Sequence, residues 1–389
     1  MKYILMNKNT KVLSANYQPS LGVFTDIYDI YNIDFAPVIL KNVYNKEKDL
    51  KIILSNWFKG RGIPLWRDDL DLLLTKLNIS APTELLDKAF GLSLSDQYWI
   101  KPYNSRIEYK DINFFEHDFK DTEFIDATFS NNTETSAKIS LISPNNTTDG
   151  RLKKTWIIEA GKRYLLKGGY KNEVLQPFNE VLAAMISSRL GFNHVTYTLE
   201  VIKDKVVSKC ESFINENTEL ISAYQILYNN CDKDDAYETY ISLLEKHEIK
   251  DPRSSLEDMF ILDYIMLNED RHLNNFGIIR DFKTLNWIST AQIFDTGESL
   301  NIIDYSDEEV IINGDGRFFY NISNFDNILD NIKDLKKYDL NKLDGICEEF
   351  DELLHKYQHI TKMTDRRINK ICTLLFSRIN KLKKKIEAK

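Results

Sequence analysis

A polar loop with carboxylate and amide side chains follows the apolar helical pattern of residues 256–268. Asp270 and Asn275 lie five residues apart in this loop, and Asp295 follows two short apolar runs, within Phe-Asp-Thr-Gly. A carboxylate can orient a hydroxyl group and take its proton, while carboxylate and amide oxygens hold Mg²⁺ against nucleotide phosphates. Kinases use this spacing because the base and the amide face the same phosphate. The pattern therefore predicts phosphoryl transfer, with Asp270 as catalytic base and Asn275 and Asp295 as Mg²⁺ ligands.

A lysine and a glutamate upstream could supply the other half of such a site. Lys167 ends a strand pattern and is followed by two glycines, and Glu180 lies in the first turn of the next helical pattern. A lysine at this place can neutralise ATP phosphates, and kinases hold it with a glutamate from the following helix. The alternatives are a solvated strand end for Lys167 and a helix-dipole contact for Glu180. Because Asp-x4-Asn alone recurs by chance, this upstream pair strengthens the prediction.

The turn-rich segment 143–151 lies between two predicted strands, where kinases keep the loop that covers the phosphates. It lacks a GxGxxG pattern, but backbone N–H groups in a turn can still bind an anion. The candidate ATP contacts in this segment are Asn146, Thr147, Thr148 and Gly150. By position alone, Ser143, Thr147 and Thr148 are candidate sites of self-phosphorylation.

The composition is that of a globular chain with two or three domains. The 389 residues are 43% hydrophobic and 28% charged, and the net charge of −8 does not favour direct nucleic-acid binding. Residues 361–389 nevertheless carry a net charge of +8. We interpret this tail as a solvated last helix, with a phosphate, nucleic-acid or membrane-binding patch as the alternative. Four cysteines without CxxC indicate free thiols, and with no apolar segment of membrane-spanning length we expect a cytoplasmic protein.

Hydrophobic periodicity separates helical and extended regions. A polar stretch at 116–136 is the predicted boundary after an N-terminal region. A helix is expected from Pro177 to Leu190, with Gly191 as its C-cap. After about residue 216 we expect helices apart from a strand-like stretch at 276–300. The other expected helices are 49–58, 66–78 and 82–90, and the expected strands are 137–143, 154–160, 163–169, 194–202 and 205–214.

Four sequence blocks between residues 143 and 300 resemble the HipA-like bacterial serine/threonine kinases, which are distantly similar to phosphatidylinositol kinases. The blocks are SPNNTTDG, LLKGG, PFNEVLAAMISSRLG, and NEDRHLNNFG with IFDTGESL. The resemblance implies that Glu211 and Phe213, in the hinge segment Glu211–Asn215, contact adenine. It also implies that His272 contacts the γ-phosphate or braces the loop, and that an antitoxin-type protein is a partner. The 143–151 segment and the first 130 residues depart from the usual family pattern.

We therefore expect an α+β, bilobal, protein-kinase-like fold. Its parts would be an N-terminal extension (1–135), a small β-rich lobe with one helix (136–215) and a larger helical lobe with a basic last helix (216–389). The expected activity is ATP- and Mg²⁺-dependent phosphorylation of a serine or threonine hydroxyl in a protein. The alternatives are a lipid or small-molecule kinase of the same fold, and a nucleotide-binding pseudokinase or interaction module.

Overall fold

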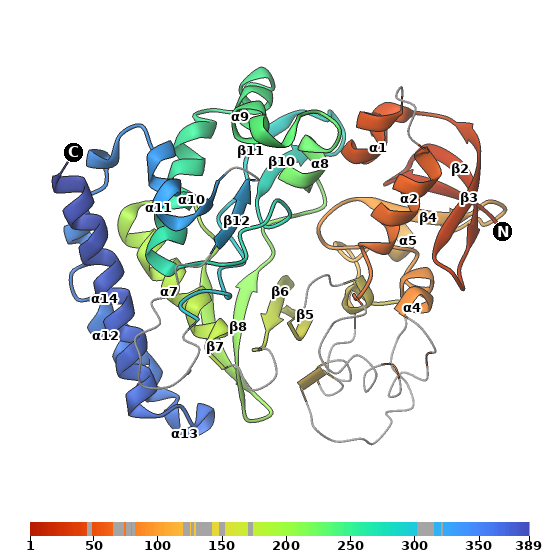
Figure 1. Ribbon diagram of the computed structural model, residues 1–389. Coiled ribbons are helices and arrows are strands. Elements are labelled where there is room, and N and C mark those ends of the chain that lie inside the picture. Colours follow the sequence, from red (N-terminus) through yellow and green to blue (C-terminus); the bar gives the residue numbers. More distant parts are fainter. Residues whose placement is uncertain are drawn as a thin grey trace.

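The computed structural model shows a mixed α/β protein built from several antiparallel sheets. It describes residues 1–44, 49–64, 74, 79, 82–119, 125, 128–129, 142–147, 152–169, 174–301, 315–319 and 322–388. Figure 1 shows the N-terminal elements on one side, the long C-terminal helices on the other, and the sheet of β5 to β8 between them. Short 3-10 helices lie at Ile33–Phe35, Pro144–Thr147, Lys233–Asp235, Leu329–Asn331, Leu335–Lys337 and Leu340–Leu343.

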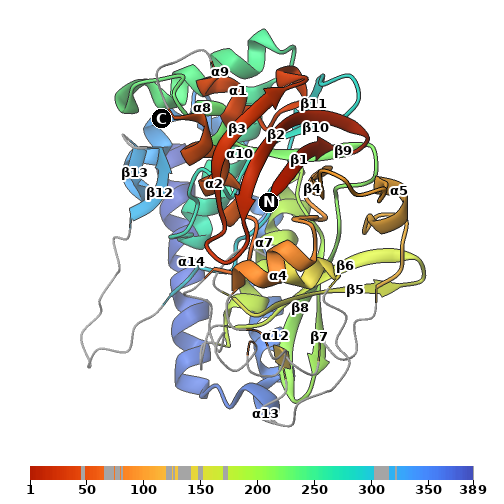
Figure 2. The same ribbon diagram turned by 90° about the vertical axis from the view of Figure 1, so that its right-hand side faces the viewer.

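The N-terminal extension has its own four-stranded sheet and apolar core. Its strands follow the order β3-β2-β1-β4, which Figure 2 shows side by side. The side chains of Leu13, Tyr17 and Phe58 are buried in this core, where the rings of Tyr17 and Phe58 meet edge to face. The helices expected at 49–58 and 82–90 are confirmed, and that at 66–78 lies almost wholly outside the described residues. The elements are β1 (Lys2–Asn7), β2 (Thr10–Gln18), β3 (Val23–Ile30), α1 (Val38–Val43), α2 (Leu50–Lys59), α4 (Pro82–Lys88), β4 (Tyr98–Pro102) and α5 (Tyr109–Ile112).

The small lobe is an antiparallel sheet with the order β5-β6-β8-β7, against which helix α7 packs. α7 ends at Gly191, whose φ of 80° suits a residue without a Cβ atom. The strand expected at 137–143 falls outside the described residues except for Ile142 and Ser143. These two form a bend before the 3-10 turn, so that part of the prediction is wrong. The elements are β5 (Lys154–Glu159), β6 (Lys162–Lys167), α7 (Gln176–Leu190), β7 (Tyr197–Ile202) and β8 (Lys205–Glu211).

The rest of the chain is mainly helical around the buried helix α10, which packs against α7, α9 and α14. It also contains three strands, β9, β12 and β13, that hydrophobic periodicity did not predict. These strands are short, and their stability comes from pairing with other strands. The elements are β9 (Thr218–Ser222), α8 (Ala223–Leu227), α9 (Ala236–Lys246), α10 (Pro252–Met266), β10 (Gly277–Asp281), β11 (Trp287–Thr290), β12 (Asp315–Phe319), β13 (Ile322–Asn324), α11 (Phe325–Ile328), α12 (Ile346–Lys356), α13 (Gln358–Thr361) and α14 (Asp365–Glu387).

The basic C-terminal segment forms the amphipathic helix α14, as expected. Arg378, on its buried side, donates hydrogen bonds of 2.9 and 3.1 Å to the Tyr264 carbonyl and lies over the Tyr264 ring. This contact joins α14 to α10, so at least one of the basic residues of the tail is part of the core. Of the helices in the described part of the chain, none has the length and apolar character that crossing a membrane requires.

Candidate active site

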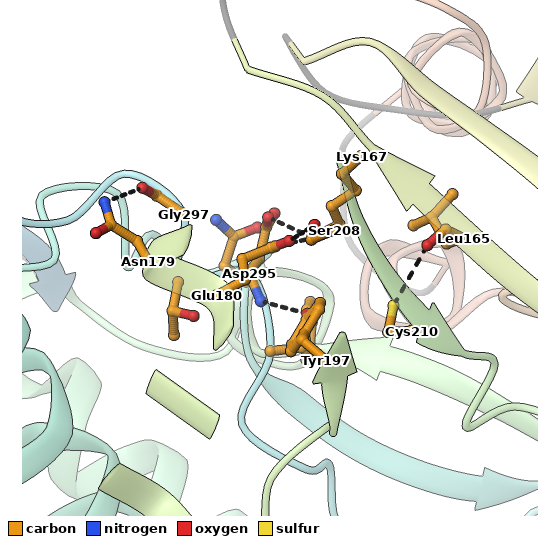
Figure 3. Close-up of polar contacts among 12 residues, drawn as sticks. Leu165, Lys167, Asn179, Glu180, Tyr197, Ser208, Cys210, Asp295 and Gly297 are labelled. Carbon is orange, nitrogen blue, oxygen red and sulfur yellow. Dashed lines mark hydrogen bonds and ion pairs between the residues drawn. The ribbon is translucent and has the colours of Figure 1, made fainter. Parts of the chain in front are cut away.

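Lys167, Glu180 and Asp295 meet at the junction of the small lobe and the larger lobe (Figure 3). Lys167 ends β6, Glu180 lies in the first half of α7, and Asp295 belongs to the segment after β11. The Lys167 Nζ atom lies 2.6 Å from Glu180 Oε1 and 2.9 Å from Asp295 Oδ1. The side chain of Lys167 is only 5% exposed, so it is not a solvated strand end. Residues far apart in the sequence thus form one charged cluster, in which Lys167 and Glu180 are buried and Asp295 is 24% exposed.

The charges in this cluster stabilise one another against the cost of burial. Burial disfavours the Lys167 ammonium, but Asp295 and Glu180 outweigh it and raise the pKa of Lys167 well above its ordinary value. Burial likewise opposes ionisation of Asp295, and the positive charges of Lys167 and Lys154 reverse this effect and lower the pKa of Asp295. Lys154 lies directly opposite Lys167 in the pairing of β5 with β6. An ammonium and a carboxylate are therefore both charged at neutral pH.

Ser208 and Asn179 hold the glutamate and the aspartate in place. The Ser208 hydroxyl donates a hydrogen bond to Glu180 Oε2, and Ser208 lies opposite Lys167 in the β6–β8 pairing. The Asn179 amide donates to the Gly297 carbonyl at 2.9 Å and to the Ser299 carbonyl, which joins α7 to the segment after Asp295. Sequence analysis missed Ser208. Its signal is a serine at a buried position of an apolar strand, which indicates a buried partner.

Replacing Ser208 with alanine is expected to destabilise the protein by about 1.5–3 kcal/mol, because a buried carboxylate loses a hydroxyl donor. The Lys167–Glu180 pair stays, so phosphoryl transfer should fall less than it does when Lys167 itself is removed. Urea unfolding measures the free-energy change. Ser377→Ala, on the exposed side of α14, is the control and should change stability by less than about 0.5 kcal/mol. Equal effects of the two substitutions would contradict the assigned role of Ser208.

The loop that carries Asp270 is fixed by its own polar groups. The Asp270 N–H donates to Asn268 Oδ1 at 3.2 Å, and the Asp270 carbonyl accepts from the His272 N–H and from Asn275 Nδ2, both at 2.8 Å. The Asp270 side chain remains 35% exposed. Its carboxylate thus stands on a rigid backbone while staying accessible, as a group that receives a substrate hydroxyl requires.

A buried arginine joins this loop to the segment of Asp295. Arg271 forms a two-point ion pair with Asp263 of α10, and both side chains are fully buried. Arg271 Nη1 also donates to the Asn275 carbonyl at 2.8 Å and to the Phe294 carbonyl at 2.6 Å. The two predicted metal ligands, Asn275 and Asp295, are therefore held on neighbouring backbone segments. The sequence alone did not assign a role to Asp263, although a buried aspartate in an apolar helix indicates a buried cation.

Gly277 completes the loop because no larger residue fits at its position. A Cβ atom there would lie 2.0 Å from the Ile221 carbonyl oxygen of β9. β10 begins at Gly277 and pairs with β9 directly after Asn275 and Phe276. The glycine in the Asn-x-Gly pattern thus lets the loop return to the sheet immediately after the predicted metal ligand.

His272 lies beside Asp270 and contacts its own loop. Its Nδ1 atom accepts a hydrogen bond of 3.2 Å from the Asn274 N–H, and its Nε2 atom lies 3.8 Å from Asp270 Oδ2. These contacts are of the kind that a bracing histidine makes. The side chain is also 40% exposed, so the predicted contact with the γ-phosphate is compatible with its placement.

The predicted phosphate loop is described only in part. Asn146 and Thr147 are buried in the 3-10 turn Pro144–Thr147, while Thr148 and Gly150 lie outside the described residues. Asn145 attaches the turn to the small lobe through hydrogen bonds with the backbone of Trp156, and the turn also packs against α4. That the backbone N–H groups of this segment bind ATP remains a prediction.

The predicted hinge residues lie at the end of β8 and just beyond it. The Glu211 carboxylate pairs with Lys162 at 2.9 Å on the surface, so a contact with adenine would come from the Glu211 backbone. The Phe213 ring packs on the Phe294 ring, with their centroids 5.5 Å apart. Phe294 precedes Asp295, so this aromatic pair joins the hinge segment to the segment of the predicted metal ligand.

The donor atoms fit a magnesium site of the kind found in kinases. The Asn275 amide nitrogen donates to the Asp270 carbonyl, which leaves the amide oxygen as the atom that can face a cation. Asp295 supplies an ionised carboxylate. In the described residues, no group of three or more His, Cys, Asp or Glu side chains could hold a metal ion. Mg²⁺ needs no such cage, because it is usually bound by one or two carboxylates together with substrate phosphates.

Neither a protein-family model nor a curated protein sequence matches the chain. Solved structures do. HipA in the Shewanella oneidensis MR-1 complex of HipA, HipB and operator DNA is similar with a TM-score of 0.54 and 13% sequence identity, over 99% of each chain. The chain has the HipA-like kinase fold. The Helicobacter pylori proinflammatory kinase CtkA is similar with a TM-score of 0.43 and 20% identity, over 60% of this chain and 94% of that chain. Because the likeness to HipA covers nearly the whole chain, the HipA-like fold includes the N-terminal extension.

Proposed function

We propose that the protein is an ATP- and Mg²⁺-dependent kinase that transfers the γ-phosphoryl group to a serine or threonine hydroxyl of a protein. The observation that carries this proposal is the contact of Lys167 with both Glu180 and Asp295, beside the rigid loop of Asp270 and Asn275. The HipA-like fold supports the same conclusion.

In this mechanism Lys167, held by Glu180, contributes positive charge beside the α- and β-phosphates of ATP. Asp270 orients the acceptor hydroxyl for in-line attack and takes its proton. Asn275 and Asp295 would hold Mg²⁺, which when bound neutralises negative charge on the phosphates. Arg271 keeps Asn275 and the segment of Asp295 in register, so the two proposed Mg²⁺ ligands need little rearrangement.

The neighbour HipA was solved with HipB and operator DNA. By analogy we propose an antitoxin-type protein as a partner, and we do not extend the DNA contact to this chain. Self-phosphorylation at Ser143 or Thr147 would require the turn at Pro144–Thr147 to open, because both side chains are buried. An intact mass that stays unchanged after incubation with ATP would argue against modification of this turn.

Incubation of the purified protein with [γ-³²P]ATP, Mg²⁺ and a cell lysate tests the proposed function. We expect label on protein, and phosphoamino-acid analysis should find it on serine or threonine. Label that extracts with lipid would instead identify a lipid kinase of the same fold. Binding of ATP without transfer to any acceptor would identify a pseudokinase.

A further inference from the structure

A short linker connects the sheet of the small lobe to the sheet of the larger lobe. It runs from the end of β8 at Glu211 to the start of β9 at Thr218. Its own polar groups fold it tightly: the Asn215 N–H donates to Thr218 Oγ1 at 3.1 Å, and the Thr218 N–H donates to the Asn215 carbonyl at 3.2 Å. Phe213 lies in this linker. The linker includes the hinge segment Glu211–Asn215, which is predicted to contact adenine. Its position therefore sets where that contact lies relative to Lys167 and Asp295.

The side chain of Gln97 connects the N-terminal extension to this linker. Gln97 directly precedes β4 and is fully buried. Its Nε2 atom donates to the Asn215 carbonyl at 3.1 Å and to the Thr218 carbonyl at 3.0 Å, so it joins the two ends of the turn. The Tyr109 hydroxyl donates to Gln97 Oε1 at 2.6 Å, which fixes the orientation of the amide with its nitrogen toward the linker.

Further contacts of the extension lie along the same stretch of chain. Lys8 Nζ donates to the Glu216 carbonyl at 3.0 Å, and the Leu220 N–H donates to the Ser95 carbonyl at 2.9 Å. Next to them, Arg280 pairs with Glu219 at 2.8 Å and donates to the Tyr98 hydroxyl at 3.0 Å, in a buried network. The extension is thus attached to the linker and to β9 by backbone and side-chain bonds that contain no residue of the proposed catalytic set.

We infer that Gln97 is a positioning residue for the nucleotide base, through which the N-terminal extension holds the linker in the geometry that binds adenine. This inference rests on the proposed function. Gln97 acts on the linker end of the site, whereas Lys167, Glu180 and Asp295 act on the phosphate end. Loss of the Gln97 contacts therefore weakens recognition of the base and leaves the chemistry of the phosphates unchanged.

The substitution Gln97→Met tests this, because methionine fills a similar volume and has no N–H group to donate. We expect the KM for ATP to rise about tenfold, the size of one net hydrogen bond, while kcat stays near the wild-type value. Inhibition by inorganic tripolyphosphate, which has no base, should be unchanged. Equal loss of ATP and tripolyphosphate affinity, or an unchanged KM for ATP, would overturn the inference.

A second variant and a matched control separate positioning from general stability. Tyr109→Phe keeps the N–H donors of Gln97 but removes the hydroxyl that fixes the orientation of its amide. We therefore expect a rise in the KM for ATP that is smaller than the rise in Gln97→Met. A folded Tyr109→Phe protein with an unchanged KM would count against the inference. Asn42 is the control, because its amide also joins the extension to backbone carbonyls, those of Gln225, Ile226 and Tyr228. Asn42→Ala should lower the melting temperature without changing the KM for ATP. If the KM of Asn42→Ala rose as much as that of Gln97→Met, the role of Gln97 would be structural only.

The inference and the proposed function fail in different ways. If the wild-type protein binds no ATP, the proposed function is overturned and the inference falls with it. If the wild-type protein binds and uses ATP but Gln97→Met retains the wild-type KM, only the inference is overturned.

Discussion

Replacement of Asp270 by asparagine is expected to slow phosphoryl transfer by about 10²–10⁴-fold, the range of a positioned general base. Asparagine has nearly the same shape but cannot take the proton of the acceptor hydroxyl. The backbone of Asp270 makes the hydrogen bonds that hold the loop, so these contacts survive the change. The initial rate with [γ-³²P]ATP gives the effect on chemistry, while the melting temperature and ATP affinity should remain close to those of the wild-type protein.

Asp204→Asn is the matched control for this experiment. Asp204 is exposed in the turn between β7 and β8, and its φ of 58° is one that asparagine tolerates as well as aspartate does. This variant carries the same loss of charge without touching the proposed site, so its rate should equal that of the wild-type protein. Wild-type activity of Asp270→Asn, or an equal loss in both variants, would remove Asp270 from the role of base.

Local signals in the sequence were sufficient for many of the elements. The helix α7 follows from its apolar pattern, the early Pro177 and the terminal Gly191, and the structure has all three features. The strands expected at 194–202 and 205–214 are also present, in shorter form, as β7 and β8, with a turn at Lys203 and Asp204 between them. β9 was missed because it has five residues and depends on pairing with β10, which follows it only after the helices α8, α9 and α10 and the Asp270 loop. Such non-local pairing leaves little trace in local periodicity.

The residues of the site were easier to predict than the groups that hold them. The types of Asp270, Asn275 and Lys167, and the five-residue spacing of the first two, are those that the proposed chemistry requires, and the structure places them in the loop and at the strand end that the sequence indicates. Ser208 and Asp263 carry no such spacing, since their partners Glu180 and Arg271 come from other elements. A buried polar residue in an apolar segment indicates that some partner exists, and only the folded chain shows which one it is.

Loss of the Lys167 ammonium is expected to have the second large effect. In Lys167→Met the phosphates lose a buried positive charge, and we expect transfer to fall by at least about 10²-fold, as on removal of a single electrostatic donor from an active site. Lys162→Met is the control, because Lys162 lies at the other end of the same strand with its side chain 58% exposed. Its rate should match that of the wild-type protein. A Lys167→Met enzyme with wild-type kcat and KM would exclude Lys167 from the phosphate site.

The same substitution is expected to destabilise the fold by about 3–5 kcal/mol at neutral pH, because it leaves the buried carboxylate of Glu180 and the partly buried carboxylate of Asp295 without their cation. In the wild-type protein Lys167 keeps the pKa of Asp295 below its ordinary value, so the stability that Asp295 provides is lost only in acid, as the pH falls through that low pKa. Without Lys167, burial acts with less opposition and raises the pKa of Asp295. The folded variant then takes up a proton more readily than the folded wild-type protein does, so the difference in stability between the two proteins narrows as the pH falls.

Melting temperatures of the two proteins, measured from about pH 8 down to about pH 5, test this sign, because a raised carboxylate pKa makes the folded state gain protons in that window. The difference in melting temperature between the wild-type protein and Lys167→Met should be largest at the high end of this pH range and should narrow toward the low end. Lys162→Met should show no such trend, since its partner Glu211 is half exposed and remains solvated when unpaired. A constant difference in melting temperature over this pH range would mean that the ionisation of Asp295 does not depend on Lys167, and the stabilising role assigned to this ion pair would then be wrong.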